Sequence, residues 1–300
     1  MPAWVLYSLL GTAIYVVVCF VDKYNLERHI KNYRGMVIYS ALVCLVMGTI
    51  LWMFSGFSLL NFKDGLLVIL TGILTVFAAS IYFYVVQKEQ ASKVIFMYQL
   101  IPVFVLILAV IFLKETINFK QIIGSILVLI PSLLIASGSG NKLKFSFDKN
   151  IALLLVIDLL NAVSLVLFKF VVEAGSFLKV VAYESWGWAI GGLILFILFP
   201  SVRNAFFETN KSIKKRVLLV ILGNEIFYVG SKFFIFLAVS LGSVYLVNVI
   251  TGTQVIFGAI LGVILTILAP HIFKENIEKA DLFKKIILGA VTLIGLGFIY

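Results

Sequence analysis

The stretch LIPVFVLILAVIFLKETINFKQIIG, residues 100–124, is an apolar run that is interrupted by the charged pair Lys114-Glu115 and then resumes. A similar pattern returns over residues 255–289, where Lys274-Glu275 interrupts a second apolar run. Charges between two long apolar segments mark the point where a chain leaves a hydrocarbon layer and turns back. The stretch therefore predicts two membrane helices joined by a hairpin, and its recurrence predicts a duplicated arrangement.

Composition also indicates a membrane protein. Hydrophobic residues make up 62% of the 300 residues and charged residues 13%, which is about half the charged share of a soluble domain. Apolar stretches of roughly 17 to 25 residues cross a ~30 Å hydrocarbon core as helices. The sequence therefore predicts an all-α integral membrane fold with ten transmembrane helices, and runs of this length exclude a membrane barrel. The predicted spans are residues 3–21, 35–57, 65–87, 94–113, 121–138, 151–172, 181–200, 217–240, 243–268 and 283–300.

The connections between these spans are too short to hold a separate catalytic domain. They contain no nucleotide-binding loop, nucleophile elbow or zinc signature. Cys19 and Cys44 fall inside apolar spans, and His29 and His271 stand alone in loops. We therefore expect no enzyme, no cofactor and no metal site.

The net charge of +10 is distributed unevenly along the chain. The loops after the odd-numbered spans hold eighteen lysines and arginines, whereas the loops on the other side hold four, namely Lys63, Lys114, Lys120 and Lys179. By the positive-inside rule, the odd-numbered loops are cytoplasmic and both termini lie outside the cytoplasmic membrane. The excess charge then faces anionic lipid head groups, and nucleic acid is not an expected partner.

The chain also repeats itself. SIYFYVVQKEQASKV, from Ser80, is similar to SKFFIFLAVSLGSVY, from Ser231, at an offset of 151 residues. This similarity predicts a first five-helix repeat at 1–138 and a second at 150–300, joined by a linker loop at 139–149. Because five is odd, the second repeat must enter the membrane from the opposite face. The two are therefore predicted to be inverted repeats with a binding site between them near the midplane.

This doubled pattern resembles the EamA-type carriers of the drug/metabolite transporter superfamily, over nearly the whole chain. The features that carry the resemblance are the turns Ala91-Ser92 and Gly242-Ser243, and Pro102, Glu115, Gly124, Glu275 and Gly289. The resemblance implies a secondary carrier of small metabolites, often an exporter of amino acids, with a central cavity lined by helices 1, 3, 4, 6, 8 and 9. The sequence departs from the family in having Thr253-Gln254 in place of a second proline. The charge count also differs from the cytoplasmic termini that are usual in the family.

Charged side chains inside the predicted spans are the leading site candidates, because each costs at least ~2.5 to 3.5 kcal/mol to place in a bilayer. They occupy two levels of helices 151–172 and 217–240. The acidic level comprises Asp158 with Asn161 and Glu225 with Tyr228, and the basic level comprises Lys169 and Lys232. Helical periodicity brings the residues of each helix onto one face. If both helices line one cavity, acid and base lie at different depths in it.

Two interpretations of these charges remain open. In the functional one, the basic level attracts a substrate carboxylate, and the acidic level receives an amine or holds an exchangeable proton. In the structural one, Asp158 pairs with Lys232, or Glu225 with Lys169, as fixed links between helices, and Lys169 extends to the interface. Glu225 and Lys232 are ~10 Å apart along one helix and cannot pair directly.

Neutral polar residues occupy matching places on predicted helices 4 and 9, and they are Tyr98, Gln99, Asn248 and Gln254. They are expected to form hydrogen bonds either to a substrate or between helices. Glu115 and Glu275 end the same two helices, where charges mark the water boundary. The alternative hypothesis for these two residues is a gating salt bridge that forms in only one state.

The leading functional hypothesis is a secondary transporter that moves amino acids, or related zwitterionic or anionic metabolites, by alternating access. Export is its expected direction, and proton coupling is one version of it. The expected partners are a small-molecule metabolite, membrane lipids and protons, and the protein is expected to be a monomer or a weak homodimer. The alternative is a lipid or polyprenyl-phosphate flippase, or a flippase subunit, which a lateral groove would indicate. No assembled His, Asp or Ser constellation favours an enzyme.

Overall fold

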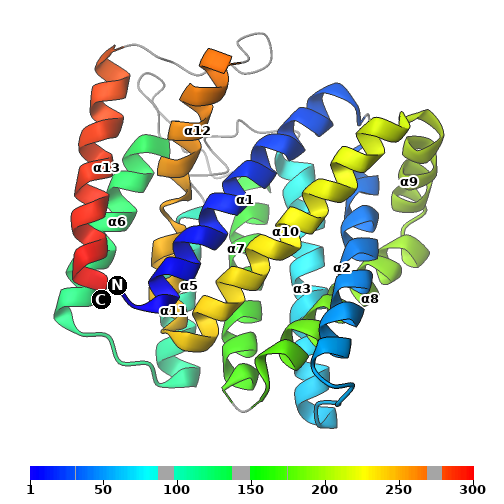
Figure 1. Ribbon diagram of the computed structural model, residues 1–300, viewed down its shortest axis with the longest axis horizontal. Helices are drawn as coiled ribbons and strands as arrows, with labels where there is room; N and C mark the ends of the chain where they lie inside the picture. Colours follow the sequence, from blue (N-terminus) through cyan, green and yellow to red (C-terminus); the bar gives the residue numbers. More distant parts are fainter. Residues whose placement is uncertain (31, 87–97, 137–148, 174, 269–278) are drawn as a thin grey trace.

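A computed structural model of the chain describes residues 1–30, 32–86, 98–136, 149–173, 175–268 and 279–300. Within these ranges the protein consists of helices and contains no strand (Figure 1). In chain order the elements are α1 (Ala3–Arg28), η1 (Tyr33–Gly35), α2 (Met36–Phe54), α3 (Phe62–Val86), α5 (Ile101–Leu108), η2 (Ala109–Leu113), α6 (Phe119–Ala136), α7 (Lys149–Val172), α8 (Phe177–Leu198), α9 (Pro200–Ser212), α10 (Lys215–Leu241), α11 (Val244–Thr251), α12 (Gln254–Leu268) and α13 (Lys279–Ile299).

Seven helical stretches in the described part of the chain are long and apolar enough to cross a membrane. They are Ala3–Arg28, Tyr33–Phe54, Phe62–Val85, Ala152–Val172, Phe177–Leu198, Lys215–Leu241 and Val244–Leu268. The other three predicted spans coincide with α5 plus η2, with α6 and with α13. The predicted all-helical membrane fold is therefore confirmed, whereas the count of ten spans stays a prediction.

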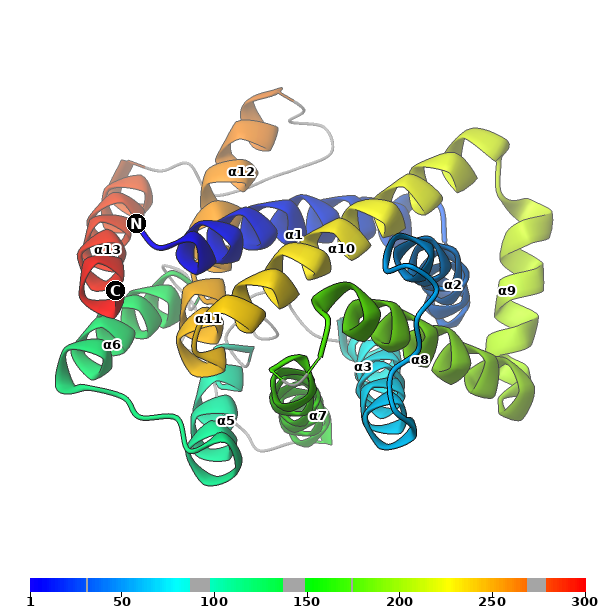
Figure 2. The ribbon, with the colours of Figure 1, turned by 60° about the horizontal axis from the view of Figure 1, so that its bottom comes forward.

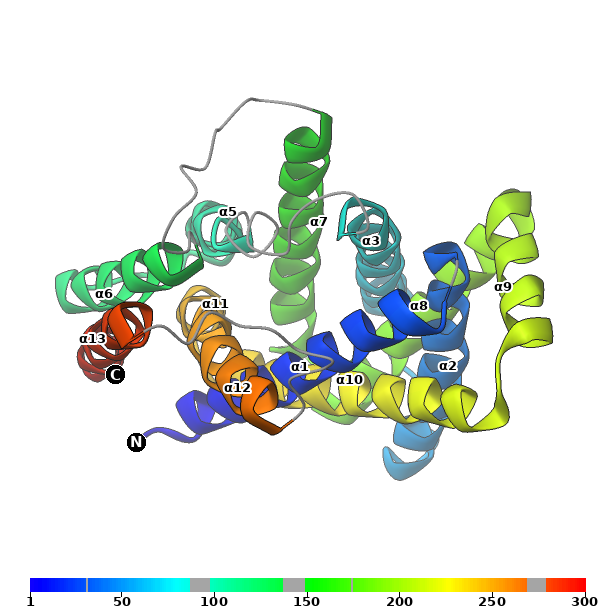
Figure 3. The same cartoon turned by 90° about the horizontal axis from the view of Figure 1, so that it is seen from above.

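Helices α1 and α10 form a long antiparallel pair, side by side in every view (Figure 1, Figure 2 and Figure 3). The Ser231 hydroxyl donates a 2.8 Å hydrogen bond to the Gly11 carbonyl oxygen. The Asn224 side-chain amide donates a 3.3 Å bond to the Val18 carbonyl oxygen. Hydrogen bonds of this kind give polar side chains the partners that hydrocarbon lacks. They tie the first part of the chain to the second.

Helices α3 and α7 form a second cross-link of the same kind. The Ser164 hydroxyl donates a 3.1 Å hydrogen bond to the Thr71 carbonyl oxygen, and its oxygen lies 2.9 Å from the Thr75 hydroxyl. In the predicted repeats α3 corresponds to α10 and α7 to α1, so equivalent helices form equivalent pairs. Helix α2 packs against α8, and α6 against α13, again across the two predicted repeats.

Apolar side chains lie both inside the bundle and over its outer surface. The largest buried cluster includes Phe168 and Phe236, whose ring centroids lie 3.9 Å apart. Large apolar side chains such as Leu42, Ile111 and Leu193 are exposed on the outside. Monomeric soluble proteins rarely expose contiguous apolar surface on this scale, so the outer surface matches hydrocarbon.

Two helical segments in the bundle begin at breaks that face each other. Gly252-Thr253 forms a turn between α11 and α12, and Gln99-Leu100 forms a turn before α5, with Pro102 in its first turn. A Cβ atom added at Gly252 would lie 2.9 Å from the Gln99 side-chain oxygen. The helical segment in the second part of the chain is therefore interrupted although it has no proline matching Pro102. A glycine at this turn allows the close approach.

Helices α3 and α8 run parallel and approach so closely that they need glycine at two contact positions. A Cβ atom added at Gly187 would overlap the Ile69 carbonyl oxygen, and one added at Gly72 would overlap the Glu184 carbonyl oxygen. Small residues permit close backbone approach between membrane helices, where van der Waals packing replaces the hydrophobic effect.

We predict that Gly187→Ala lowers the stability of the detergent-solubilised protein by about 1 to 3 kcal/mol, because the added methyl group overpacks the contact between α3 and α8. Thermal unfolding followed by circular dichroism measures the effect. Gly297→Ala is the matched control, since no described atom lies within 4 Å of a Cβ atom at that position. Equal transition midpoints for the two variants would contradict the close approach.

Candidate functional site

A cavity of about 90 Å³ lies inside the bundle between residues of α1, α2, α3, α7, α8 and α10, together with Tyr98. It lies nearer the end of the bundle where α1 ends and α10 begins, which is the upper end in Figure 1. Helices from both predicted repeats contribute to its wall. It is the place where the polar side chains of the bundle meet.

Two carboxyl groups, of Asp22 on α1 and Glu225 on α10, form the charged part of this wall. The Ser40 hydroxyl donates a 2.6 Å hydrogen bond to Glu225 Oε2, and the Asn224 amide donates a 2.8 Å bond to Asp22 Oδ1. Glu225 is 4% exposed. The two carboxyl groups are close enough to interact electrostatically. Both known donors are neutral, so no positive charge balances this pair within the lining.

Aromatic rings form the rest of the polar wall. Tyr82 and Tyr98 stack with their ring centroids 5.5 Å apart. Tyr228 bridges the cavity wall, with its centroid 6.3 Å from that of Tyr15 and 5.5 Å from that of Trp188. Four tyrosines and one tryptophan therefore surround the two carboxyl groups, and the described lining contains no lysine, arginine or histidine.

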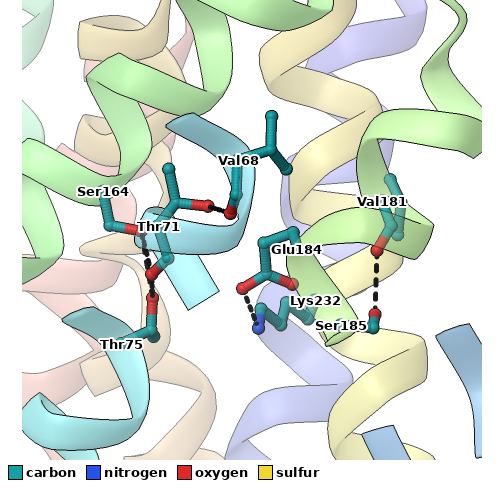
Figure 4. Close-up of polar contacts among 8 residues, drawn as sticks. All are labelled: Val68, Thr71, Thr75, Ser164, Val181, Glu184, Ser185 and Lys232. Carbon is teal, nitrogen blue, oxygen red and sulfur yellow. Dashed lines mark hydrogen bonds and ion pairs between the residues drawn. The ribbon is translucent and has the colours of Figure 1, made fainter. Parts of the chain in front are cut away.

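Lys232 lies behind this wall and pairs with Glu184. Its Nζ donates a 2.5 Å hydrogen bond to Glu184 Oε1 (Figure 4). The same Nζ lies 4.3 Å from the centre of the Trp188 ring. Glu184 is fully buried and its other oxygen has no described partner. An ion pair at this depth offsets the large desolvation cost of each charge. Lys232 is therefore neutralised outside the cavity lining.

The six intramembrane candidates are only partly brought together. Asn161, Glu225 and Tyr228 line the cavity, whereas Asp158 is fully buried beside it with both carboxyl oxygens lacking a described partner. Lys169 forms a 3.1 Å ion pair with Glu173 on its own helix.

The pairs Asp158–Lys232 and Glu225–Lys169, which the sequence suggested, are not among the ion pairs of the described residues. The basic level that was expected across the cavity is also outside it. Each lysine is held by a nearer acid, because a buried ammonium takes the closest carboxylate that its helix packing allows. The sequence alone did not reveal which acid that would be.

Of the neutral polar candidates, Tyr98 lines the cavity and the other three do not. The Asn248 amide donates a 2.9 Å bond to the Val244 carbonyl oxygen of its own helix. Gln99 is buried at the break before α5, and its amide has no described partner. Gln254 begins α12 and is partly exposed. Gln99 and Gln254 therefore lie at the helix breaks rather than in the cavity.

Glu115 caps the first turn of α11 at the opposite end of the bundle. The Ser243 hydroxyl donates a 2.5 Å hydrogen bond to Glu115 Oε2, and the Val244 N–H donates a 2.8 Å bond to Oε1. A carboxylate is favourable at a helix N-terminus, where backbone N–H groups are unpaired. Glu115 thus ties the end of η2 to α11, while Glu275 lies outside the described residues.

Asp22 and Glu184 are site residues that the sequence analysis did not select. Asp22 was assigned to a loop because the predicted span ended at residue 21, but α1 continues to Arg28. Glu184 was near the predicted water boundary, but α8 begins at Phe177 and places it two turns inside. A longer helix estimate would have found both. No group of three metal-ligating side chains occurs in the part of the chain that the structure covers.

Comparisons with known proteins identify the family. Residues 2–137 match the model of the EamA-like transporter family. This stretch belongs to the EamA-like transporter family. The resemblance to EamA carriers of the drug/metabolite transporter superfamily is therefore confirmed, and the protein is a multi-pass membrane protein. No curated protein matches the chain.

A solved structure shares the fold of this protein. One crystal structure, described only as that of a protein, aligns with 99% of this chain and 98% of its own at 14% sequence identity. The TM-score of that alignment is 0.73. Since the sequences are so different, the likeness concerns the fold alone.

We predict that Glu184→Gln lowers protein stability by about 3 to 5 kcal/mol, because it leaves the Lys232 ammonium buried without its carboxylate. The double variant Glu184→Gln with Lys232→Met should recover most of the loss. Glu173→Gln is the matched control, because Glu173 is 55% exposed and its pair with Lys169 contributes little. Thermal unfolding checks all three, and a Glu184→Gln protein as stable as the control would contradict the burial of this pair.

Proposed function

We propose that this protein is a secondary transporter that moves a small metabolite across the membrane by alternating access. The observation that supports this proposal most is a polar cavity between the two parts of the chain. The first part of the chain belongs to a transporter family. Secondary carriers bind their substrates near the midplane between their repeats. The membership of that family also fits a role without catalysis.

The proposed mechanism requires two inverted repeats, residues 1–138 and 150–300, joined by residues 139–149. Under the proposed repeat α1 corresponds to α7 and α10 to α3, so the pair α1–α10 corresponds to the pair α7–α3. This correspondence supports the inverted arrangement. The turns at Gln99-Leu100 and Gly252-Thr253 support it as well, because they interrupt equivalent parts of the chain and face each other. Ten spans follow if α5 with η2, α6 and α13 also cross the membrane.

One departure from this symmetry suggests how the two states differ. Helix α3 packs closely on α8 through Gly72, while the equivalent contact of α10 with α2 is much less extensive. At the offset of 151 residues, Gly223 on α10 is the counterpart of Gly72. A Cβ atom at Gly223 would meet no described atom within 4 Å. We propose that in the other state α2 closes onto Gly223 while α8 leaves Gly72.

This exchange makes Gly223→Ala a test of alternating access. The methyl group fits the present structure, so thermal stability should be unchanged or slightly higher. The other state should be blocked, so substrate exchange in proteoliposomes should fall by at least tenfold, an effect of roughly 1.4 kcal/mol. Gly297→Ala is the control. Transport of the Gly223→Ala protein at the control rate would contradict the proposed exchange.

The open end of the cavity is proposed to face the cytoplasm, with both termini outside. The loops that follow α1 and precede α10 belong to the basic set, which the positive-inside rule assigns to the cytoplasm. Glu115, at the opposite end, links η2 to Ser243 and Val244 and is proposed to hold the outside closed in this state. This retains Glu115 as a gating residue.

A cysteine at Ala79, which lines the cavity, tests the orientation and the gate together. In a protein without Cys19 and Cys44, this cysteine should react with a membrane-impermeant thiol reagent added from the cytoplasmic side of oriented vesicles. Adding Glu115→Gln should increase its reaction from the outer side, because the cap on α11 is weakened. Reaction from the outer side alone in the parent protein would reverse the orientation.

A lateral groove of about 690 Å³ is the observation that favours the second candidate, a lipid flippase. It lies between α2, α8 and α9, at the edge of the bundle where α9 is found in Figure 2. Its described lining contains no charged side chain to hold a phosphate. The tight contact of Ala41 with Gly192 separates it from the polar cavity. Carrier function is therefore the better supported proposal, and lipid translocation requires α2 and α8 to separate.

A further inference from the structure

We propose that the cavity binds a small organic cation, an amine whose ammonium group lies between Asp22 and Glu225. The inference deepens the proposed transport function by naming a substrate class, but binding itself rests on the cavity alone. It differs from the sequence hypothesis of an anionic or zwitterionic substrate, because the basic level of that hypothesis is not in the lining.

The first argument is charge. The described lining contains two carboxyl groups and no basic side chain. Lys232, whose Nζ lies 4.3 Å from the centre of the Trp188 ring, is paired with Glu184 at 2.5 Å and is not part of the described lining. A carboxylate ligand would therefore enter a site without a counter-charge, at a cost that buried pairs normally avoid. A cation would meet two opposite charges at once.

The second argument concerns hydrogen bonds that the protein does not complete. Ser40 bonds one oxygen of Glu225, and Asn224 bonds one oxygen of Asp22. Glu225 Oε1 and Asp22 Oδ2 have no partner among the described residues. Glu225 is nonetheless 4% exposed, so bulk water does not surround it. Carboxylates accept but do not donate, so a group with several N–H donors and a positive charge is their natural ligand.

The third argument is the aromatic wall. Tyr15, Tyr82, Tyr98, Tyr228 and Trp188 surround the carboxyl groups. The faces of such rings carry negative potential and attract ammonium groups, which is how aromatic cages hold methylated amines. The Lys232 ammonium already illustrates this attraction, since it lies 4.3 Å from the centre of the Trp188 ring.

The size of the cavity limits the amine. About 90 Å³ is well below the roughly 300 to 1,000 Å³ of pockets for drug-sized ligands. A short primary amine or a small quaternary ammonium fits this volume better than a nucleoside or a phosphorylated sugar does.

The test compares probes of similar size and different charge on the purified, detergent-solubilised full chain. Ethylammonium, tetramethylammonium, acetate and ethanol are titrated at constant ionic strength, and the thermal transition is followed by tryptophan fluorescence. The two cations should raise the transition in a saturable way, because a ligand that binds only the folded state stabilises it. Acetate and ethanol should not raise it.

Glu225→Gln and Asp22→Asn should each weaken the apparent cation affinity on the order of tenfold, since each removes one close opposite charge. Glu173→Gln is the control, because this exposed carboxylate follows the end of α7 and is not part of the described lining. If a variant does not fold, the comparison of the two cations with acetate on the unmodified protein still tests the proposed cation site. Stabilisation by acetate, or a transition that responds to pH but to no cation, would overturn the proposal.

The outcome is separable from that of transport. Saturable cation binding without any exchange of labelled amine in proteoliposomes would remove the proposed carrier function and leave the binding site standing. If the protein exchanged an anionic metabolite but bound neither cation, the proposed cation site would be removed and the proposed carrier function would stand.

Discussion

The structure depends on one constraint, that hydrocarbon supplies no hydrogen-bond partner and no counter-charge. Helices satisfy this constraint because their backbone N–H and C=O groups bond to each other, and most of the described chain is helical. The helix breaks at Gln99 and Gly252 lie against each other inside the protein. Polar side chains answer it by bonding neighbouring helices, as Ser231 does to α1 and Ser164 to α3. These bonds connect the first part of the chain to the second.

The same constraint distinguishes charged side chains that have a charged partner from those that have only neutral donors. Lys232 and Glu184 pair with each other beside Trp188, and neither is part of the described cavity lining. Asp22 and Glu225 receive only neutral donors, so no basic side chain of the described residues is paired with them. The ion pair and the proposed binding site therefore lie next to the same Trp188 side chain. Which charged residues are structural and which functional follows from partners, not from residue type.

The packing around two glycines differs between the two parts of the chain. Gly72 and Gly223 are counterparts in the proposed repeat, but α8 is packed against the first while the second faces open space. Counterpart positions in unequal surroundings fit a protein with two exchangeable packings. The small cavity on the α10 side and the closed contact on the α8 side are then two aspects of a single conformation.

Hydropathy, length and internal similarity are properties of contiguous sequence, and for that reason the sequence by itself determined the helical membrane fold, most helix positions and the family. It also brought Asn161, Glu225, Tyr228 and Tyr98 into consideration, because helical periodicity assigns faces. Only the tertiary structure decided that Lys232 pairs with Glu184, that Lys169 pairs with Glu173, that Asp22 enters the cavity and that Glu115 caps α11. Those outcomes depend on helix ends and on contacts between segments far apart in the chain, and a local pattern carries no information about which of several acids packs nearest a given base.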